Sequence, residues 1–144
     1  MKFRLPALES TSIAASQISI AIIQAASSDN FPGWSSEINL QELQSSPFLK
    51  ETIEYTSTFS LAWIAVGIYY KLYDAEITTV RFGDIIDQTN RQMIGAANLT
   101  ILLVLTLCFA QHTPFPVDQY MLHLTSAYVF NLLLRVVYFN AGFF

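Results

Sequence analysis

Three long stretches without a charged residue constrain this chain of 144 residues more than any other feature. Asp, Glu, Lys and Arg are all absent from Tyr55–Tyr70, Gln92–Val117 and Gln119–Leu134. Each stretch approaches or exceeds the ~17–25 apolar residues with which a helix crosses a bilayer. The composition agrees, because 53% of the residues are hydrophobic and only 12% are charged, whereas ~25% is usual in soluble domains. The sequence therefore predicts an integral membrane protein.

The predicted fold is an all-α membrane protein with three transmembrane helices, preceded by a polar, partly helical N-terminal tail. We expect the spans at about residues 52–73, 92–111 and 119–140, within a membrane domain of residues 51–144. Residues 1–50 are polar, Ser-rich and acidic, which favours an extramembrane tail. Ser, Thr and Gln recur through residues 10–28, which favours an amphipathic surface helix at 10–26. The alternative is that residues 10–28 enter the membrane as a fourth span.

The basic residues predict an orientation. Lys71, Arg81 and Arg91 all flank the loop between the first two spans, whereas the other side offers Lys50. Positively charged loops stay on the side from which the protein is inserted. We therefore expect loop 74–91 on the cytosol, stroma or matrix side of an organelle inner membrane, mitochondrial or thylakoid.

Arg135 is the residue that most needs an explanation, because it follows the third uncharged stretch and nine uncharged residues come after it. Arginine at the centre of a membrane helix costs ~2.5–3.5 kcal/mol on insertion scales, so it usually faces protein or water and has a partner. The alternative is that Arg135 reaches to the membrane surface along its aliphatic stem. One helical face carries a polar stripe, made of Tyr128, Asn131, Arg135, Tyr138 and Gly142.

The second span carries a matching stripe, made of Gln88, Arg91, Gly95, Asn98 and Leu102. Ala96 and Thr100 there fit the small-xxx-small pattern of closely packed helices. Packing the two stripes together would bring Arg91 and Arg135 to one end of the bundle, where they suit an anion. Neutralisation by Asp84, Asp87 or a partner subunit is the alternative. The candidates for binding an anion or lipid headgroup, or for pairing between subunits, are Arg91, Asn98, Asn131, Arg135 and Tyr138.

Catalytic, metal and nucleic-acid sites have little support in the sequence. His112 and His123 are candidates for a metal or a pigment magnesium, but no carboxylate or cysteine set surrounds them. Cys108 is the single cysteine and lies within an apolar run, so we expect it to fill space. The sequence has no run of basic residues, so we do not expect it to bind nucleic acids. We name no catalytic residue and no metal site.

Two segments resemble the MAPEG family, the membrane-associated proteins of eicosanoid and glutathione metabolism. Leu134–Gly142 is similar to the Arg-x-x-Tyr-Phe-Gln-Gly ending of that family's third helix. Arg91–Asn98 is similar to the family's Arg-Ala-x-x-Asn-x-x-Glu, with Gly95 in place of Asn and Asn98 in place of Glu. The resemblance covers about residues 52–142. It implies a trimeric glutathione-dependent transferase or isomerase, with the thiol held by Arg91, Asn98, Arg135 and Tyr138. Family enzymes have four spans, whereas three are predicted here.

The function expected from the residues is that of a non-catalytic accessory subunit in a larger membrane complex, of the bioenergetic kind. Short spans have few contacts of their own, and helices in lipid associate through packing and polar contacts. The expected partners are other membrane subunits and lipids. A MAPEG-like enzyme is the alternative, and a pigment- or lipid-binding module is the second. Bound lipid is the expected ligand, ahead of glutathione or chlorophyll.

Overall fold

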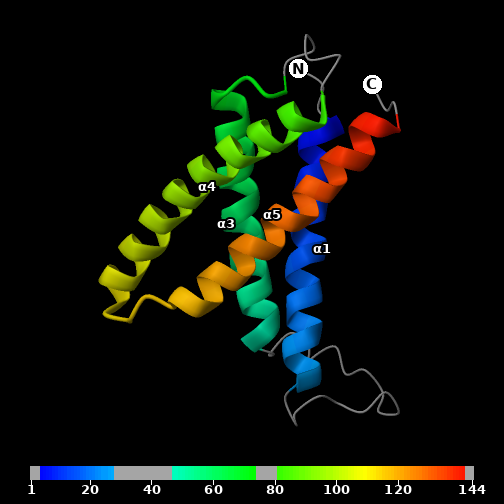
Figure 1. The fold of residues 1–144 in the computed structure, drawn as a ribbon. Coiled ribbons are helices and arrows are strands. Elements are labelled where there is room, and N and C mark those ends of the chain that lie inside the picture. Colours follow the sequence, from blue (N-terminus) through cyan, green and yellow to red (C-terminus); the bar gives the residue numbers. More distant parts are fainter. Residues whose placement is uncertain (1–3, 28–46, 74–80, 142–144) are drawn as a thin grey trace.

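The computed structural model describes residues 4–27, 47–73 and 81–141, and it is helical throughout these ranges apart from short turns (Figure 1). The helices are α1 (Arg4–Ser27), α3 (Pro47–Tyr69), α4 (Phe82–Gln111) and α5 (Val117–Asn140). The described part of the chain contains no strand. The prediction of an all-α protein is therefore confirmed.

Two of the described helices, α4 and α5, are long and apolar enough to cross a membrane. The first predicted span, residues 52–73, corresponds to much of α3 and the turn after it. That helix carries Glu54 and polar residues at 56–58 in its first half, which lower its hydropathy. A membrane protein is supported by α4 and α5, but the prediction of three spans is not confirmed.

Helix α1 packs against α3 and α5 as part of the bundle (Figure 1). Its buried residues recur along one side and include Leu5, Glu9, Ile13, Ser16, Gln17 and Ile20. The helix expected at 10–26 is present and longer, but a tail that stays apart from the bundle is not confirmed. The polar residues that suggested a surface helix include Ser16 and Gln17, which are buried among other helices. Residues 1–3 and 28–46 of the predicted tail lie outside the described residues.

Aromatic rings fill the core between α3 and α5. Phe59 and Trp63 on α3 and Tyr120 on α5 are each at most 2% exposed. The rings of Phe59 and Tyr120 lie 5.7 Å apart. Helix α4 packs on α3 and α5, and none of its described residues contacts α1. The core is therefore shared by all the described helices, and α1 and α4 lie on opposite sides of α3 and α5 (Figure 1).

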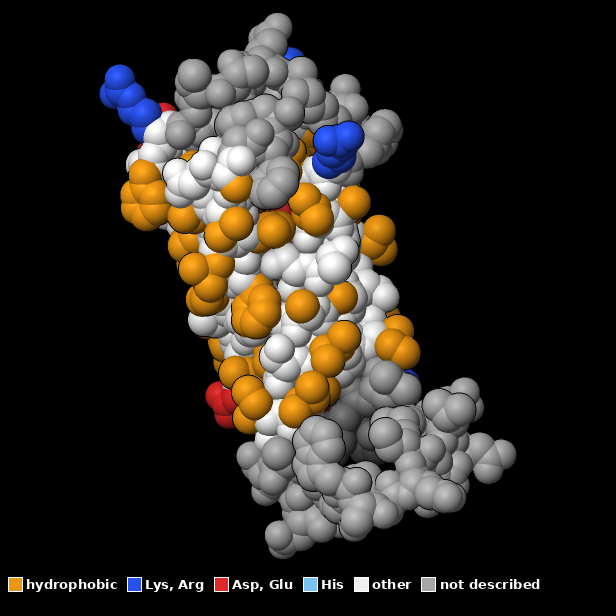
Figure 2. All heavy atoms as spheres, turned by 90° about the vertical axis from the view of Figure 1, so that its right-hand side faces the viewer, with side chains coloured by type: hydrophobic (Ala, Val, Ile, Leu, Met, Phe, Trp, Pro, Cys, Tyr) orange, Lys and Arg blue, Asp and Glu red, His pale blue; other side chains and the backbone are white. Residues whose placement is uncertain are grey.

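The outer surface is apolar over much of its length. Figure 2 shows hydrophobic side chains gathered along the middle of one face, with basic groups towards one end and an acidic group towards the other. Exposed large apolar residues occur on all the described helices, and Phe109 on α4 is 85% exposed. Such a surface is unusual for a soluble monomer and suits contact with lipid or with other membrane helices.

Helices α3 and α4 approach closely at two glycines. A Cβ atom on Gly67 would lie 2.4 Å from Cε2 of Tyr73 and 2.6 Å from Nε2 of Gln92. A Cβ atom on Gly95 would lie 2.6 Å from Cγ1 of Val66. Ala96 and Thr100 are fully buried on the same helix, as the small-residue pattern predicts. The absence of side chains at these glycines therefore allows the two helices to pack.

We expect Gly67→Ala to destabilise the fold, since the added methyl group must displace the Tyr73 ring and the Gln92 amide. Overpacking of this kind costs ~1–3 kcal/mol. The control is Gly83→Ala, where a Cβ atom meets nothing within 4 Å. Unfolding in detergent micelles, followed by circular dichroism, measures both. Equal stability of the two variants would contradict the close approach.

Candidate functional site

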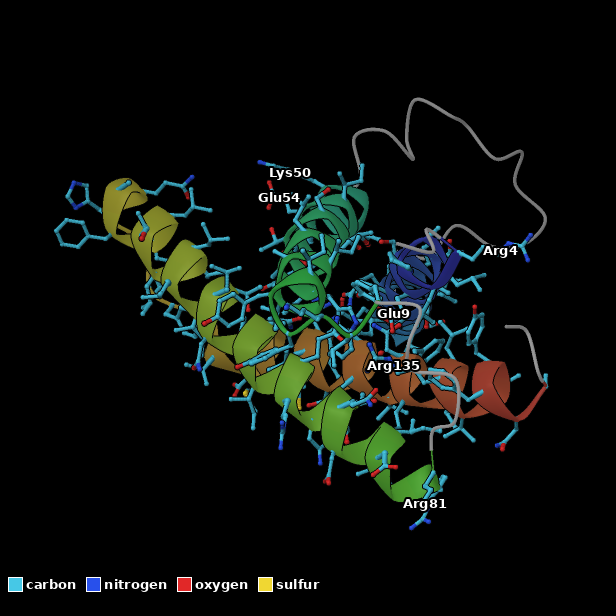
Figure 3. All side chains as sticks on the ribbon, turned by 90° about the horizontal axis from the view of Figure 1, so that it is seen from above. Arg4, Glu9, Lys50, Glu54, Arg81 and Arg135 are labelled. Carbon is cyan, nitrogen blue, oxygen red and sulfur yellow. The ribbon has the colours of Figure 1, made fainter. Side chains whose placement is uncertain are left out.

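Glu9 on α1 and Arg135 on α5 form an ion pair inside the bundle (Figure 3). Nε of Arg135 donates a hydrogen bond to Oε1 of Glu9. The two side chains are 0% and 2% exposed, for Glu9 and Arg135 respectively. Arg4, Lys50, Glu54 and Arg81 lie at the periphery in the same view. A buried pair of this kind is stable only when further hydrogen bonds satisfy the rest of both groups.

The carboxylate of Glu9 receives those further bonds from α3 and from the turn that follows it. Its Oε2 accepts a hydrogen bond from Nε1 of Trp63 at 3.1 Å and from the Tyr73 hydroxyl at 2.6 Å. Tyr73 comes back towards α3 because Lys71 adopts a left-handed conformation with φ 55°. The backbone N–H of Leu72 then donates to the carbonyl oxygen of Gly67 at 2.9 Å. The turn thus brings a phenol to the carboxylate.

The guanidinium of Arg135 is satisfied by α4. Nη2 of Arg135 donates to Oε1 of Gln92, and Nη1 donates to Oγ1 of Thr89 at 3.3 Å. Nε2 of Gln92 donates to the carbonyl oxygen of Trp63 at 2.6 Å and to the Tyr73 hydroxyl at 2.9 Å. The Trp63 ring centre lies 5.9 Å from Cζ of Arg135, within range of a cation–π interaction.

We call these residues the polar cluster: Glu9, Trp63, Tyr73, Thr89, Gln92 and Arg135. The cluster joins α1, α4, α5 and the segment of α3 with its following turn. Its two charges cancel, and each of its acidic oxygens and guanidinium nitrogens has a protein partner. The arrangement therefore favours holding helices together over binding an external anion.

A second buried polar contact lies further along α1 and α5. Nδ1 of His123 hydrogen-bonds with Oε1 of Gln17, whose Nε2 donates to the His123 carbonyl oxygen at 3.2 Å. The imidazole stacks on the Tyr55 ring at 3.9 Å between centres. Nε2 of His123 and both polar atoms of the Asn131 amide are buried without a hydrogen-bond partner among the described residues. This histidine thus connects α1, α3 and α5 through packing.

The predicted site residues divide into two groups. Asn131, Arg135 and Tyr138 are buried on one side of α5, as their stripe suggested. Arg91 and Asn98 are exposed on α4. The buried side of α4 is rotated by one residue from the predicted stripe, so Gln92 meets Arg135 in place of Arg91. Gly142 lies outside the described residues.

The residues that neutralise Arg135 also differ from the expectation. Asp84 and Asp87 are exposed, and Glu9 supplies the negative charge. The sequence contains a sign of this role, because Glu9 shares a helical face with Leu5, Ile13 and Gln17. If this face of α1 is assigned to the interior of the bundle, Glu9 becomes a candidate partner for Arg135.

The remaining candidates have ordinary surroundings. His112 is exposed and caps the end of α4 in a left-handed conformation with φ 53°. Cys108 is half-buried, with Sγ 3.8 Å from the carbonyl oxygen of Pro114. Across residues 4–27, 47–73 and 81–141, no three His, Cys, Asp or Glu residues gather in a group that could hold a metal ion.

Comparison with known proteins gives no match to a family model, a curated protein or a solved structure. The MAPEG resemblance therefore stays a hypothesis based on its motif residues. Of the residues that it implies around one thiol, Arg91 and Asn98 are exposed on α4, whereas Arg135 and Tyr138 are buried on α5.

We expect removal of either charge of the ion pair to destabilise the bundle strongly. Arg135→Met leaves the Glu9 carboxylate buried without a counter-charge, and Glu9→Leu does the same to Arg135. Breaking a buried pair by removing one partner costs ~3–5 kcal/mol, whereas replacing both partners by apolar residues is often nearly neutral. The double variant should therefore lose much less stability than the sum of the single variants. Detergent unfolding of all three proteins gives this coupling free energy.

The matched control is Lys50→Met. Lys50 pairs with Glu54 at 3.9 Å, but its side chain is 80% exposed, and exposed pairs add little stability. This control should unfold like the unmodified protein. Strictly additive losses at positions 9 and 135 would contradict the ion pair.

Proposed function

We propose that the protein is a non-catalytic, membrane-embedded accessory subunit of a larger multi-subunit complex. Its role is to add a rigid helical unit that packs against neighbouring membrane subunits and lipids. The proposal includes an organelle inner membrane of the bioenergetic kind, with loop 74–91 on the cytosol, stroma or matrix side. Residues 74–80 of that loop lie outside the described residues.

The observation that carries the proposal is the contrast between the interior and the surface. In the polar cluster, the carboxylate and the guanidinium are bonded to groups of the chain itself. The surface, by contrast, offers large apolar side chains on every described helix, among them Ile23, Leu61, Leu102 and Leu133, each at least 60% exposed. Interior charges used for cohesion and a surface suited to lipid and protein contact favour a structural role over catalysis.

The glutathione-dependent alternative needs the arginines to be available to a ligand's carboxylates. Glu9 occupies that role at Arg135, and Gln92 and Thr89 bond the other guanidinium nitrogens. A ligand carboxylate would have to displace Glu9 and leave it buried without a counter-charge. This cost makes the enzyme the less favoured candidate.

Native purification from the protein's own membranes tests the proposal. A tag on the chain, mild detergent and mass analysis of the purified material should give a large assembly with other membrane subunits at fixed stoichiometry. Isolation as a homotrimer that turns over glutathione would overturn the proposal in favour of the enzyme.

Two variants make this experiment specific. Arg135→Leu should lower incorporation into the assembly, because the unpaired Glu9 loosens the bundle that neighbours contact. Lys50→Gln, which alters an exposed charge, should be incorporated like the unmodified chain. Equal incorporation of both variants would argue against assembly through the intact bundle.

A further inference from the structure

Helix α4 has an outward side with a regular pattern. Its buried residues are Ile85, Thr89, Gln92, Ala96 and Thr100. On the opposite side of the helix, apolar residues recur at spacings of three and four around one amide. We call this side the outer face, made of Ile94, Asn98, Leu102, Leu105 and Phe109. All five residues are exposed, and the spacing is that of helices which pack side by side along their length.

Asn98 gives the outer face a need for a partner. It lies near the middle of α4, the more apolar of the two helices that could cross a membrane. Among the residues that the structure describes, none forms a hydrogen bond with its amide. Thr106, another exposed polar residue on α4, is different, because its hydroxyl donates to the Leu102 carbonyl oxygen of the same helix at 2.7 Å. An amide facing hydrocarbon is costly until another helix supplies a donor and an acceptor.

The outer face continues into one acidic and one basic residue, so two copies of this face can have complementary charges. Asp87 and Arg91 precede Ile94 at the same spacing, and both are exposed. Copies of one chain share one orientation in the membrane, so two α4 helices meet in parallel. Around a two-fold axis, Asp87 of one copy then lies beside Arg91 of the other, and the reverse. Asn98 meets Asn98, and an amide both donates and accepts.

We propose that the outer face of α4 binds the same face of a second copy of this chain, forming a parallel two-fold dimer. The Asn98 amides pair at the middle of the interface, and Asp87–Arg91 pairs close one end. A second copy fits this face because each copy presents both charges, Asp87 and Arg91, and because the Asn98 amide can both donate to and accept from the same amide of the other copy. The dimer does not depend on the accessory role: it would form equally within a larger complex or alone.

Cysteine cross-linking in lipid vesicles tests this interface. In a Cys108→Ser background, Leu105→Cys places a thiol on the outer face and Leu103→Cys places one on the opposite side of α4. The two positions are matched, since each leucine is 47% exposed. Mild oxidation should cross-link the position-105 variant into dimers, at lipid dilutions where the position-103 variant stays monomeric. Equal cross-linking of the two variants would overturn the proposal.

Second substitutions in the Leu105→Cys protein test the amide and the charges. Asn98→Leu should reduce the dimer several-fold, whereas Thr106→Leu, off this face, should leave it unchanged. Asp87→Arg should weaken the dimer by opposing two arginines, and adding Arg91→Asp should restore it. A dimer indifferent to Asn98→Leu and to both charge changes would also overturn the proposal. The vesicles contain this chain alone, so failure here leaves the accessory role standing, and purification without other subunits leaves the dimer standing.

Discussion

The ion pair between Glu9 and Arg135 is the interaction on which the rest of the structure depends. Two opposite charges buried in an apolar bundle are tolerable only while both are paired and fully hydrogen-bonded. Helix α3 and its turn supply Trp63 and Tyr73, and α4 supplies Gln92 and Thr89. Because hydrogen bonds are directional, these contacts fix how the helices rotate and how deeply each one lies against its neighbours.

The distribution of polarity reverses what is usual in a soluble bundle. Glu9 and Gln17 on α1 are buried, whereas leucines of α4 and α5 are exposed. Every described helix contributes buried polar residues: Glu9, Ser16 and Gln17 on α1, Thr52 on α3, Thr89, Gln92 and Thr100 on α4, and His123, Asn131 and Arg135 on α5. The polar interior is therefore shared among the helices, including the two that are apolar enough to cross a membrane.

Periodicity predicted the helices and the buried stripe of α5, because a repeat of three and four is a local property of the sequence. It missed Glu9 as the partner of Arg135, since 126 residues separate them and polar composition favoured a surface position for α1. The assignment of Arg91 to the interior differs from the structure by one residue. One residue turns a helix by about 100°, which is enough to exchange Arg91 for Gln92. Small residues at 95 and 96 are compatible with either rotation, so only the tertiary partners decide.

The same sequence separation sets an order for making the protein. Glu9 is synthesised long before Arg135, so the counter-charge with which it pairs in the bundle is absent until α5 has been translated. A carboxylate alone in hydrocarbon is strongly disfavoured. During biogenesis the Glu9 carboxylate therefore needs water or another protein as its partner until Arg135 is available. The contacts between α1 and α5 can form only after α5 has been made, so this part of the bundle closes late.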